Sequence, residues 1–255
     1  MTIHFLNCFT CNARYPRHWQ TGGLCLLIEG DNGLVLVDTG LGTGDYIREP
    51  WILITFKLTT IVPLNPAEAA IRQIRELGFQ PEDVRHIVLT HLHFDHAGGL
   101  PDFPWAKVHL HYAEYDHFLS GRFRQWTDGG YNRRVLDHTP NLELYEKLDS
   151  TWYDFDAIRL RLEPEIYLLP LPGHTPGHCG VAIKDGGSWH FHAGDAASFA
   201  EDAPDWLVKF VLGPHQPRLR DFNKKHPEVF MTMGHMHKKF FEIAPQGGKP
   251  PARAN

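Results

Sequence analysis

The sequence predicts one α/β domain with layered sheets. Helix-like and strand-like stretches are mixed along the 255 residues, and several neighbouring strand pairs suit antiparallel ladders. With 42% hydrophobic and 22% charged residues, the composition is that of an ordinary globular protein with a substantial core. We expect residues 1–243 to form this domain, and the Pro- and Gly-containing segment 244–255 to be a flexible tail.

The first half of the chain reads as short strands and one clear helix. Strands are predicted at 3–7, 24–30, 33–40 and 84–90, the third ending in a turn. Residues 66–78 predict a helix with Pro66 near its start and Gly78 as its C-cap. Residues 44–65 are apolar, aromatic and interrupted by prolines, without alternation. We interpret them as an apolar insert near the functional site.

The second half continues the mixed pattern. Helices are predicted at 112–120, 203–212 and 215–225, and strands at 107–111, 157–162, 165–171, 180–185, 188–195 and 228–235. Residues 121–141 are predicted to be a loop. Its arginines could grip an anionic substrate, although a solvated loop face is the interpretation we favour: Arg122, Arg124, Arg133 and Arg134.

Charge and cysteine content bound the partners and the compartment. A net charge of -5 argues against nucleic acid as a partner. Cys8 and Cys11 form a C-x-x-C that could be half a zinc site or a redox pair, but no second pair completes it, so we favour a packing role. The four cysteines give no disulfide framework. With no signal peptide or membrane-length apolar run recognised, we expect a reducing, cytoplasmic location.

The stretch LTHLHFDHAGGLP, residues 89–101, concentrates metal-binding side chains. On a helix, His91 and Asp95 would share a face while His93 and His96 pointed away, so no single site could use all four. An extended start followed by a tight turn lets His91 and His93 meet one ion, and Asp95 and His96 a second. The spacing therefore favours two adjacent ions, unlike the helical H-E-x-x-H pattern.

Three further strand ends offer more ligands. LPGHTPGH supplies His174, HFHAGD supplies Asp195, and MGHMH supplies His235. Zinc takes about four ligands, and a catalytic site leaves one place for water. His174 and His235 can complete one site each, and Asp195 can bridge ions about 3.5–4 Å apart. Nitrogen and oxygen ligands without thiolate fit zinc and equally permit manganese, iron or cobalt.

THLHFDHAGG, LPGHTPGH, HAGD and MGH, in this order, resemble the metallo-β-lactamase superfamily. The resemblance implies a four-layer αβ/βα sandwich with mixed sheets and paired metals in the cleft between its halves. It also implies how the ligands are shared. One ion would be held by His91, His93 and His174, the other by Asp95, His96 and His235, with Asp195 bridging both.

Within the superfamily the chain looks most like the N-acyl homoserine lactonases. Two features carry this likeness: the segment ELGFQPEDV at 76–84, and the apolar insert before the helix expected at 66–78. That family has a tyrosine three residues after the bridging aspartate, where this chain has Ser198. The likeness implies opening of a lactone or related ester by attack of a hydroxide shared by two metal ions. Asp95 would take the proton and pass it to the leaving alkoxide.

Other activities on the same scaffold remain alternatives. A glyoxalase II-like thioesterase is one, although only about 20 residues follow His235, too few for that family's added helical domain. A phosphodiesterase is disfavoured by the acidic balance. An iron-dependent redox enzyme would need another ligand set or a flavin domain. We expect no membrane span and a small-molecule substrate. Four apolar residues of the insert could line a pocket or form the contact of a homodimer: Trp51, Ile52, Ile54 and Phe56.

The remaining residues near the ligands have structural and functional interpretations. Asp38 either orients a ligand histidine or caps its own turn, and His192 could support a ligand. We favour a structural role for His178, which would shape the loop that presents His174. Phe94 and Phe199 either wall the substrate or only pack.

Overall fold

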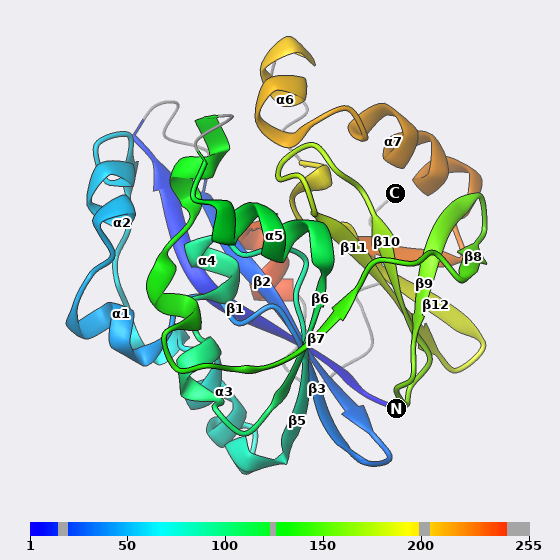
Figure 1. The fold of residues 1–255 in the computed structure, drawn as a ribbon, viewed down its shortest axis with the longest axis horizontal. Helices are drawn as coiled ribbons and strands as arrows, with labels where there is room; N and C mark the ends of the chain where they lie inside the picture. The colour runs from blue at the N-terminus through cyan, green and yellow to red at the C-terminus, as the bar shows by residue number, and fades with distance from the viewer. Residues whose placement is uncertain (15–19, 123–125, 199–204, 244–255) are drawn as a thin grey trace.

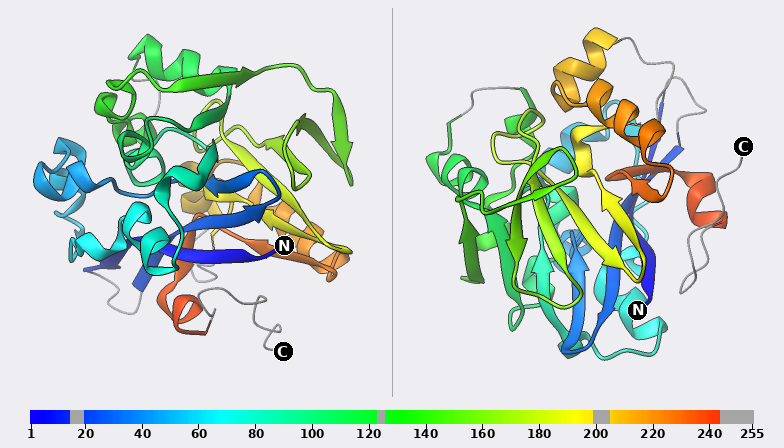
Figure 2. Two further views of the ribbon diagram at one scale, coloured as in Figure 1. Left: turned by 90° about the horizontal axis from the view of Figure 1, so that it is seen from below. Right: turned by 90° about the vertical axis from the view of Figure 1, so that its right-hand side faces the viewer.

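Two β-sheets face each other and carry helices on their outer sides (Figures 1 and 2). The structure, a computed structural model, describes residues 1–14, 20–122, 126–198 and 205–243. The four-layer αβ/βα arrangement predicted from the sequence is therefore confirmed. None of the helices within these ranges is long and apolar enough to cross a membrane.

The first sheet has the strand order β4-β1-β2-β3-β5-β6-β7, and β14 pairs with β2 beside this path. Its strands are β1 (Ile3–Ala13), β2 (Gln20–Gly30), β3 (Gly33–Val37), β4 (Thr60–Ile61), β5 (Val84–Val88), β6 (Lys107–His111), β7 (Asn141–Tyr145) and β14 (His235–His237). The pairs β3–β5, β5–β6 and β6–β7 are parallel, whereas β1–β2 and β2–β3 are antiparallel.

The second sheet has the order β13-β12-β11-β10-β9-β8. Its strands are β8 (Ser150–Trp152), β9 (Phe155–Leu160), β10 (Ile166–Pro170), β11 (Cys179–Asp185), β12 (Ser188–His192) and β13 (Val229–Thr232). The helices are α1 (Thr43–Ile47), α2 (Trp51–Phe56), α3 (Ala70–Glu76), α4 (Phe94–Ala97), α5 (Tyr112–Ser120), α6 (Asp205–Leu212), α7 (Gln216–Lys225) and α8 (Lys238–Ile243).

Layering explains the continuous apolar run from Leu24 to Ile28 in β2. In β2, Leu24 and Leu26 pack between the sheets, while the alternate residues Cys25 and Leu27 pack toward α3. Because successive side chains point to opposite faces, a strand covered on both faces has no polar positions. A third cluster, which includes Phe222 of α7, covers the outer face of the second sheet.

Several predicted elements differ from those observed. The helix expected at 66–78 is divided at Ala69 into a 3-10 turn and α3, although Gly78 follows it with a positive φ of 91°. Strand β1 extends well beyond residue 7, and β7 and β8 were not predicted. The loop expected at 121–141 contains two 3-10 helices. The predicted tail 244–255 lies outside the described residues.

The strand expected at 228–235 is two strands in different sheets. Strand β13 ends at Thr232 in the second sheet, and β14 begins at His235 in the first. The backbone N–H of Gly234 donates to the carbonyl of Gly194 at 2.8 Å, and its carbonyl accepts from the N–H of Leu24 at 2.7 Å. This crossing of the chain between the sheets places His235 at the cleft.

Candidate metal site

Four segments from both halves of the sandwich meet at one end of the sheets. His91 follows β5, and the chain stays extended through His93 before Asp95 and His96 enter α4. His174 lies in the loop after β10. Asp195 lies in a 3-10 turn after β12, and His235 begins β14. Because all four positions end or begin strands of a packed scaffold, their side chains are held by rigid elements.

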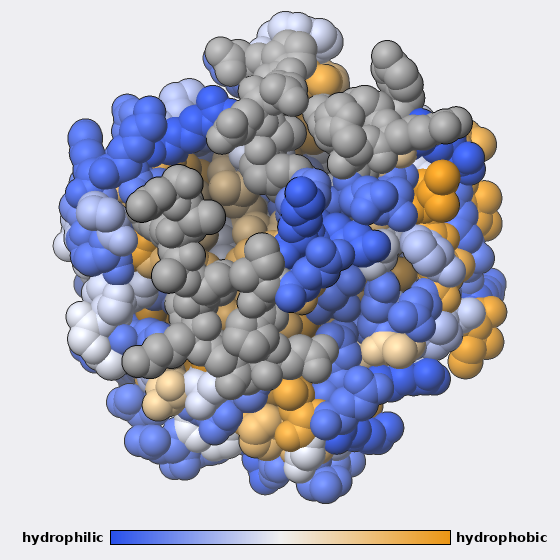
Figure 3. Space-filling view, turned by 180° about the vertical axis from the view of Figure 1, so that it is seen from behind, coloured by the Kyte–Doolittle hydropathy of each residue, from blue (hydrophilic) through white to orange (hydrophobic). Residues whose placement is uncertain are grey.

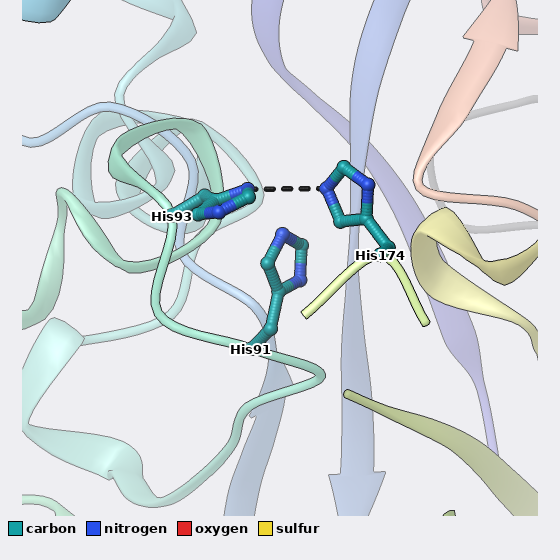
Figure 4. A group of neighbouring side chains, drawn as sticks. All are labelled: His91, His93 and His174. Carbon is teal, nitrogen blue, oxygen red and sulfur yellow. Dashed lines mark hydrogen bonds between the residues drawn. The ribbon is translucent and has the colours of Figure 1, made fainter. Parts of the chain in front are cut away.

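His91, His93 and His174 form one compact group (Figure 4). One ligand atom from each lies within 4.8 Å of the others. Nδ1 of His93 is 3.1 Å from Nε2 of His174. Asp95, His96 and His235 form a second group by the same measure. In that group Nε2 of His235 lies 3.4 Å from Oδ2 of Asp95.

Asp195 lies between the two groups. Its Oδ2 is 3.3 Å from Nε2 of His174 in the first and 3.4 Å from Nε2 of His235 in the second. Its Oδ1 is 3.5 Å from Nε2 of His96. The structure therefore brings all seven predicted ligand residues together around one carboxylate.

Hydrogen bonds at Nδ1 orient three of the imidazoles. His96 contacts Oδ2 of Asp38 at 2.8 Å, and His174 contacts the carbonyl of Val211 at 2.7 Å. His91 contacts Oγ1 of Thr90 at 3.0 Å, and this hydroxyl donates to Asp38 at 2.7 Å. Each Nδ1 that donates its proton leaves Nε2 as a lone-pair donor for a cation. Asp38 therefore orients a ligand histidine, which is one of the two roles that we considered for it.

Several buried polar atoms in this cluster lack a hydrogen-bond partner among the described residues. They are Nε2 of His91, His93 and His96, and Oδ1 of Asp195. Buried polar atoms are usually paired, so four orphans in one cluster need an explanation. Imidazole nitrogens and a carboxylate oxygen are ligands of divalent transition ions, and the residues present therefore fit such ions.

Burial and neighbouring charges shift the pKa values of the histidines and of Asp195 in this cluster. Burial lowers the pKa of His91 and His93 well below the usual value, and neighbouring histidines lower it further. Burial also acts to lower the pKa of His235, but Asp195 and Asp95 outweigh it and raise the value to about 10. The same balance, through Asp195 and Asp38, raises the pKa of His96. Burial opposes ionisation of Asp195, but His235 and His96 hold its pKa well below the usual range.

Glu114 of α5 is a buried residue that the sequence analysis missed. Its Oε1 accepts from the N–H of Leu92 at 2.9 Å and from the hydroxyl of Tyr131 at 2.9 Å. Its Oε2 accepts from Oγ1 of Thr175 at 2.7 Å and from the N–H of Gly177 at 3.1 Å. The carboxylate joins the segment of His91 and His93 to the loop of His174. In the sequence, Glu114 was recognisable only as an acidic residue in the helix expected at 112–120, directly after the strand expected at 107–111.

Other predicted residues have structural contacts. His178 was expected to shape the loop of His174. Its backbone N–H donates to the carbonyl of Thr175 at 3.3 Å within that loop, and its Nε2 also accepts from the backbone N–H of Asp195 at 2.9 Å. Cys8 and Cys11 are buried free thiols in β1. Arg134 contacts Asp45 at 3.7 Å and lies away from the cluster, while Arg124 and Phe199 fall outside the described residues.

An apolar pocket of about 340 Å³ opens beside the cluster. Asp95 and His235 lie on its wall, and the insert contributes Ile52 and Phe56. Phe94 also lines it. The other two insert residues proposed for a pocket or a dimer contact point elsewhere, since Trp51 and Ile54 are 61% and 58% exposed.

Comparison with known proteins identifies the family of this site. The sequence profile of the metallo-beta-lactamase superfamily matches residues 19–229. The chain belongs to this superfamily. Membership in the metallo-beta-lactamase superfamily makes the chain a metallo-hydrolase, and the fold implies binding of divalent metal.

Relatives within the superfamily differ in how specifically they are named. A probable metallo-hydrolase of Mycobacterium tuberculosis is 35% identical over 260 aligned positions, which cover 91% of this chain and 79% of that protein. An N-acyl homoserine lactonase of Bacillus cereus is 30% identical over 161, which cover 63% of this chain and 57% of the lactonase.

Solved structures give the same fold. An N-acyl homoserine lactone hydrolase with N-hexanoyl-L-homoserine bound at its catalytic metal center superposes with a TM-score of 0.67 and 23% identity. The match covers 92% of each chain. At this identity the likeness shows the fold alone.

Proposed function

We propose that this metallo-beta-lactamase superfamily member opens a lactone or related ester at two divalent ions, most simply zinc. His91, His93 and His174 would hold one ion, Asp95, His96 and His235 the other, and Asp195 both. The observation that supports this assignment is the position of Asp195, whose Oδ2 lies 3.3 Å from His174 and 3.4 Å from His235. Residues 1–243 would act as one unit, with the insert 44–65 bordering its pocket.

Two bound cations would polarise an ester carbonyl and make a water nucleophilic near neutral pH. The protein's own residues would then position the substrate and move the proton. Asp95 lies on the pocket wall, where it can accept the proton of the attacking water and return it to the leaving alkoxide. Its carboxylate is ready to accept, because His235 and His96 lower its pKa although burial acts to raise it.

The apolar wall supports an acylated substrate. Ile52 and Phe56 face Val211 and Leu212 across the same pocket, so an aliphatic chain would lose water contact on several sides. Lactonases among the relatives are named for N-acyl homoserine lactones, which combine such a chain with an ester ring. Ser198, at the position of the lactonase tyrosine, also lines the pocket.

A metal analysis and a substrate panel test the proposal together. Protein purified without chelator should contain about two transition ions per chain. Its kcat/KM should be greater for acyl homoserine lactones and simple γ-lactones than for thioesters and bis-phosphodiesters. A preference for thioesters would overturn the lactonase assignment while leaving the metal site intact. Absence of bound transition metal would overturn the site itself.

Variants separate ligand loss from general damage. Asp95→Asn should lower kcat by about 10²–10⁴-fold, because the amide cannot carry the proton. His235→Ala should lower the metal content. The matched change His226→Ala, at the end of α7, should leave both kcat and the metal content unchanged. Full activity of Asp95→Asn would rule out its role in proton transfer.

A further inference from the structure

Every residue of helix α2 except Thr55 is apolar, although part of the helix faces solvent. Leu53 is fully buried, and Ile52 and Phe56 line the pocket. The outward side carries Trp51 and Ile54, which are 61% and 58% exposed. A helix that is hydrophobic all round normally lies inside a protein or against lipid. The outer side of α2 is therefore unusually apolar for a surface that is exposed to solvent.

Helix α6 is apolar except for Asp205 and Lys209, and it borders the same pocket. Its residues Val211 and Leu212 line the pocket, and Val208 is buried. Trp206, near its start, is 71% exposed. Two short helices, separated by about 150 residues of chain, thus present large apolar side chains around one opening. In Figure 1, α2 lies at the left and α6 at the top, and both are far from the N-terminus at the lower right.

The exposed side of the insert extends this apolar surface. Ile47 at the end of α1 is 89% exposed, and Leu58 just after α2 is 77% exposed. In Figure 3, hydrophobic groups lie along the margin occupied by α1 and α2. We call the exposed apolar residues of α1, α2, α6 and the turn after α2 the apolar rim, and they are Ile47, Trp51, Ile54, Leu58, Trp206 and Phe210.

Positive charge accompanies the apolar rim. Arg14 donates from Nη2 to the carbonyl of Lys57 at 3.0 Å, so its guanidinium lies beside the end of α2. Arg48 follows α1, and Lys209 lies within α6. All three are exposed, and within the described part of the chain none of them forms an ion pair with a carboxylate.

The opposite end of the molecule is acidic. Glu29, Asp31, Glu163 and Glu165 border one hollow beside Met1. This hollow lies at the N-terminal end of β1, whereas Arg14 follows the other end of that strand. The hollow is lined by these four carboxylates and by Lys184, so carboxylates are in excess at this end of β1 and Arg14 lies at the other end. Such a separation would turn the apolar rim toward a negative surface.

We propose that the apolar rim docks this protein on an anionic lipid bilayer, with the pocket opening toward the lipid. Tryptophan and aliphatic side chains with interleaved cations are the composition that binds the headgroup region of such bilayers. A second copy of the chain fits the rim less well, because it would bring Arg14, Arg48 and Lys209 against the same cations. Docking does not depend on the reaction that the site performs.

Vesicle co-sedimentation of the full chain tests the proposal. Binding is expected with vesicles of equal parts phosphatidylglycerol and phosphatidylcholine, and little with phosphatidylcholine alone. Raising the salt from about 0.05 to about 0.5 M should weaken it, because salt screens charges beyond a few ångströms. The pair Trp51→Ser and Ile54→Ser should reduce the partition coefficient by at least about tenfold, since two large side chains no longer enter the interface.

A matched control uses an exposed apolar residue away from the rim. Leu148, which is 47% exposed between β7 and β8, is changed to Ser, and vesicle binding should match that of the unaltered chain. Arg14→Glu should weaken binding to the anionic vesicles only. Three results would overturn the proposal: no binding to anionic vesicles, equal binding by the rim and control variants, or a dimer in sedimentation velocity that the rim variants dissociate.

Discussion

Gly234 is the residue at which the backbone fits most tightly against the candidate metal site. A Cβ atom built there would collide with Oδ1 of Asp195 and lie 2.9 Å from Cε1 of His96. Its backbone groups also hold the loop of Gly194 and the start of the β2 core in place. Only a residue without a side chain can bring the two sheets this close beside Asp195.

Replacing Gly234 by Ala should therefore damage the site more than the fold. The methyl group would push Asp195 away from His96 and His235, and we expect metal affinity to fall by about 10–100-fold. Competition with a chromogenic chelator measures this change. Gly187→Ala is the control, because a Cβ there meets nothing within 4 Å. Equal affinity of the two variants would contradict the argument.

Asp45 in α1 gives a pH dependence that can be assigned to one group. Burial raises its pKa from 3.8 to about 6, although the N–H of Gly42 and the charge of Arg134 act to lower it. Between these two pKa values the folded chain binds more protons than the unfolded chain. Asp45 therefore contributes roughly 3 kcal/mol to the free energy of unfolding. The contribution is complete below about pH 4 and is lost as the pH rises through about 6.

Asp45→Asn should remove this part of the pH dependence. The amide oxygen can still accept from Gly42, which Asp45 contacts at 3.0 Å. Relative to the unaltered chain, the variant should gain free energy of unfolding when the pH rises from about 4.5 to about 7. Urea unfolding at several pH values measures the difference, with the exposed Asp31→Asn as control. A difference that stays constant with pH would contradict the assignment.

At the scale of elements, Glu114 makes α5 a connector between two ligand segments. Its pKa is raised by burial, although four donors stabilise the carboxylate. In Glu114→Gln the amide nitrogen cannot accept from a backbone N–H, so one of Leu92 and Gly177 loses its partner. We expect a loss of about 1–3 kcal/mol in the free energy of unfolding.

Activity and stability together distinguish the roles of Glu114. The displaced loop should also lower kcat/KM at saturating metal, because His174 depends on the same loop for its position. Glu146→Gln, at an exposed site after β7, should change neither quantity. Unaltered stability of Glu114→Gln would mean that the four contacts are not structurally important.

The same elements show how far the sequence could be interpreted. The alternation of helix-like and strand-like segments predicted one α/β domain with layered sheets. The family and its four-layer sandwich were predicted from the resemblance of four motifs: THLHFDHAGG, LPGHTPGH, HAGD and MGH. The break between β13 and β14 carried no such signal, since Val229 to His235 is continuously strand-like. It is imposed by pairing with Gly22 and Gly23 of β2, which only the folded chain brings near. The edge strands β7 and β8 were missed because they are short and partly polar.

At the scale of the whole molecule, the candidate metal site connects the two halves of the sandwich. His91, His93 and His96 come from the first sheet's side, and His174 and Asp195 from loops of the second. Cations held by both would stabilise the folded chain by binding it and not the unfolded chain. Chelation should therefore lower Tm, and hydrogen exchange should rise first in the loops after β5, β10 and β12.

Metal loading should also release protons, because neighbouring carboxylates favour the protonated form of two ligand histidines. Nearby carboxylates overcome the effect of burial and raise the pKa of His235 to about 10, and that of His96 is raised for the same reason. A histidine ligand must be neutral, so at neutral pH loading should displace protons from these histidines, and affinity should increase with pH. Asp195 adds none, since its pKa is already low.

Calorimetric titration of metal into chelator-treated protein, in buffers with different ionisation enthalpies, counts these protons. His235→Ala should release about one proton fewer than the unaltered chain, because its charged imidazole is absent. The control His226→Ala should release the same number as the unaltered chain. If loading released no protons, His235 and His96 would not be charged before the cations bind, and the effect assigned to their carboxylate neighbours would be wrong.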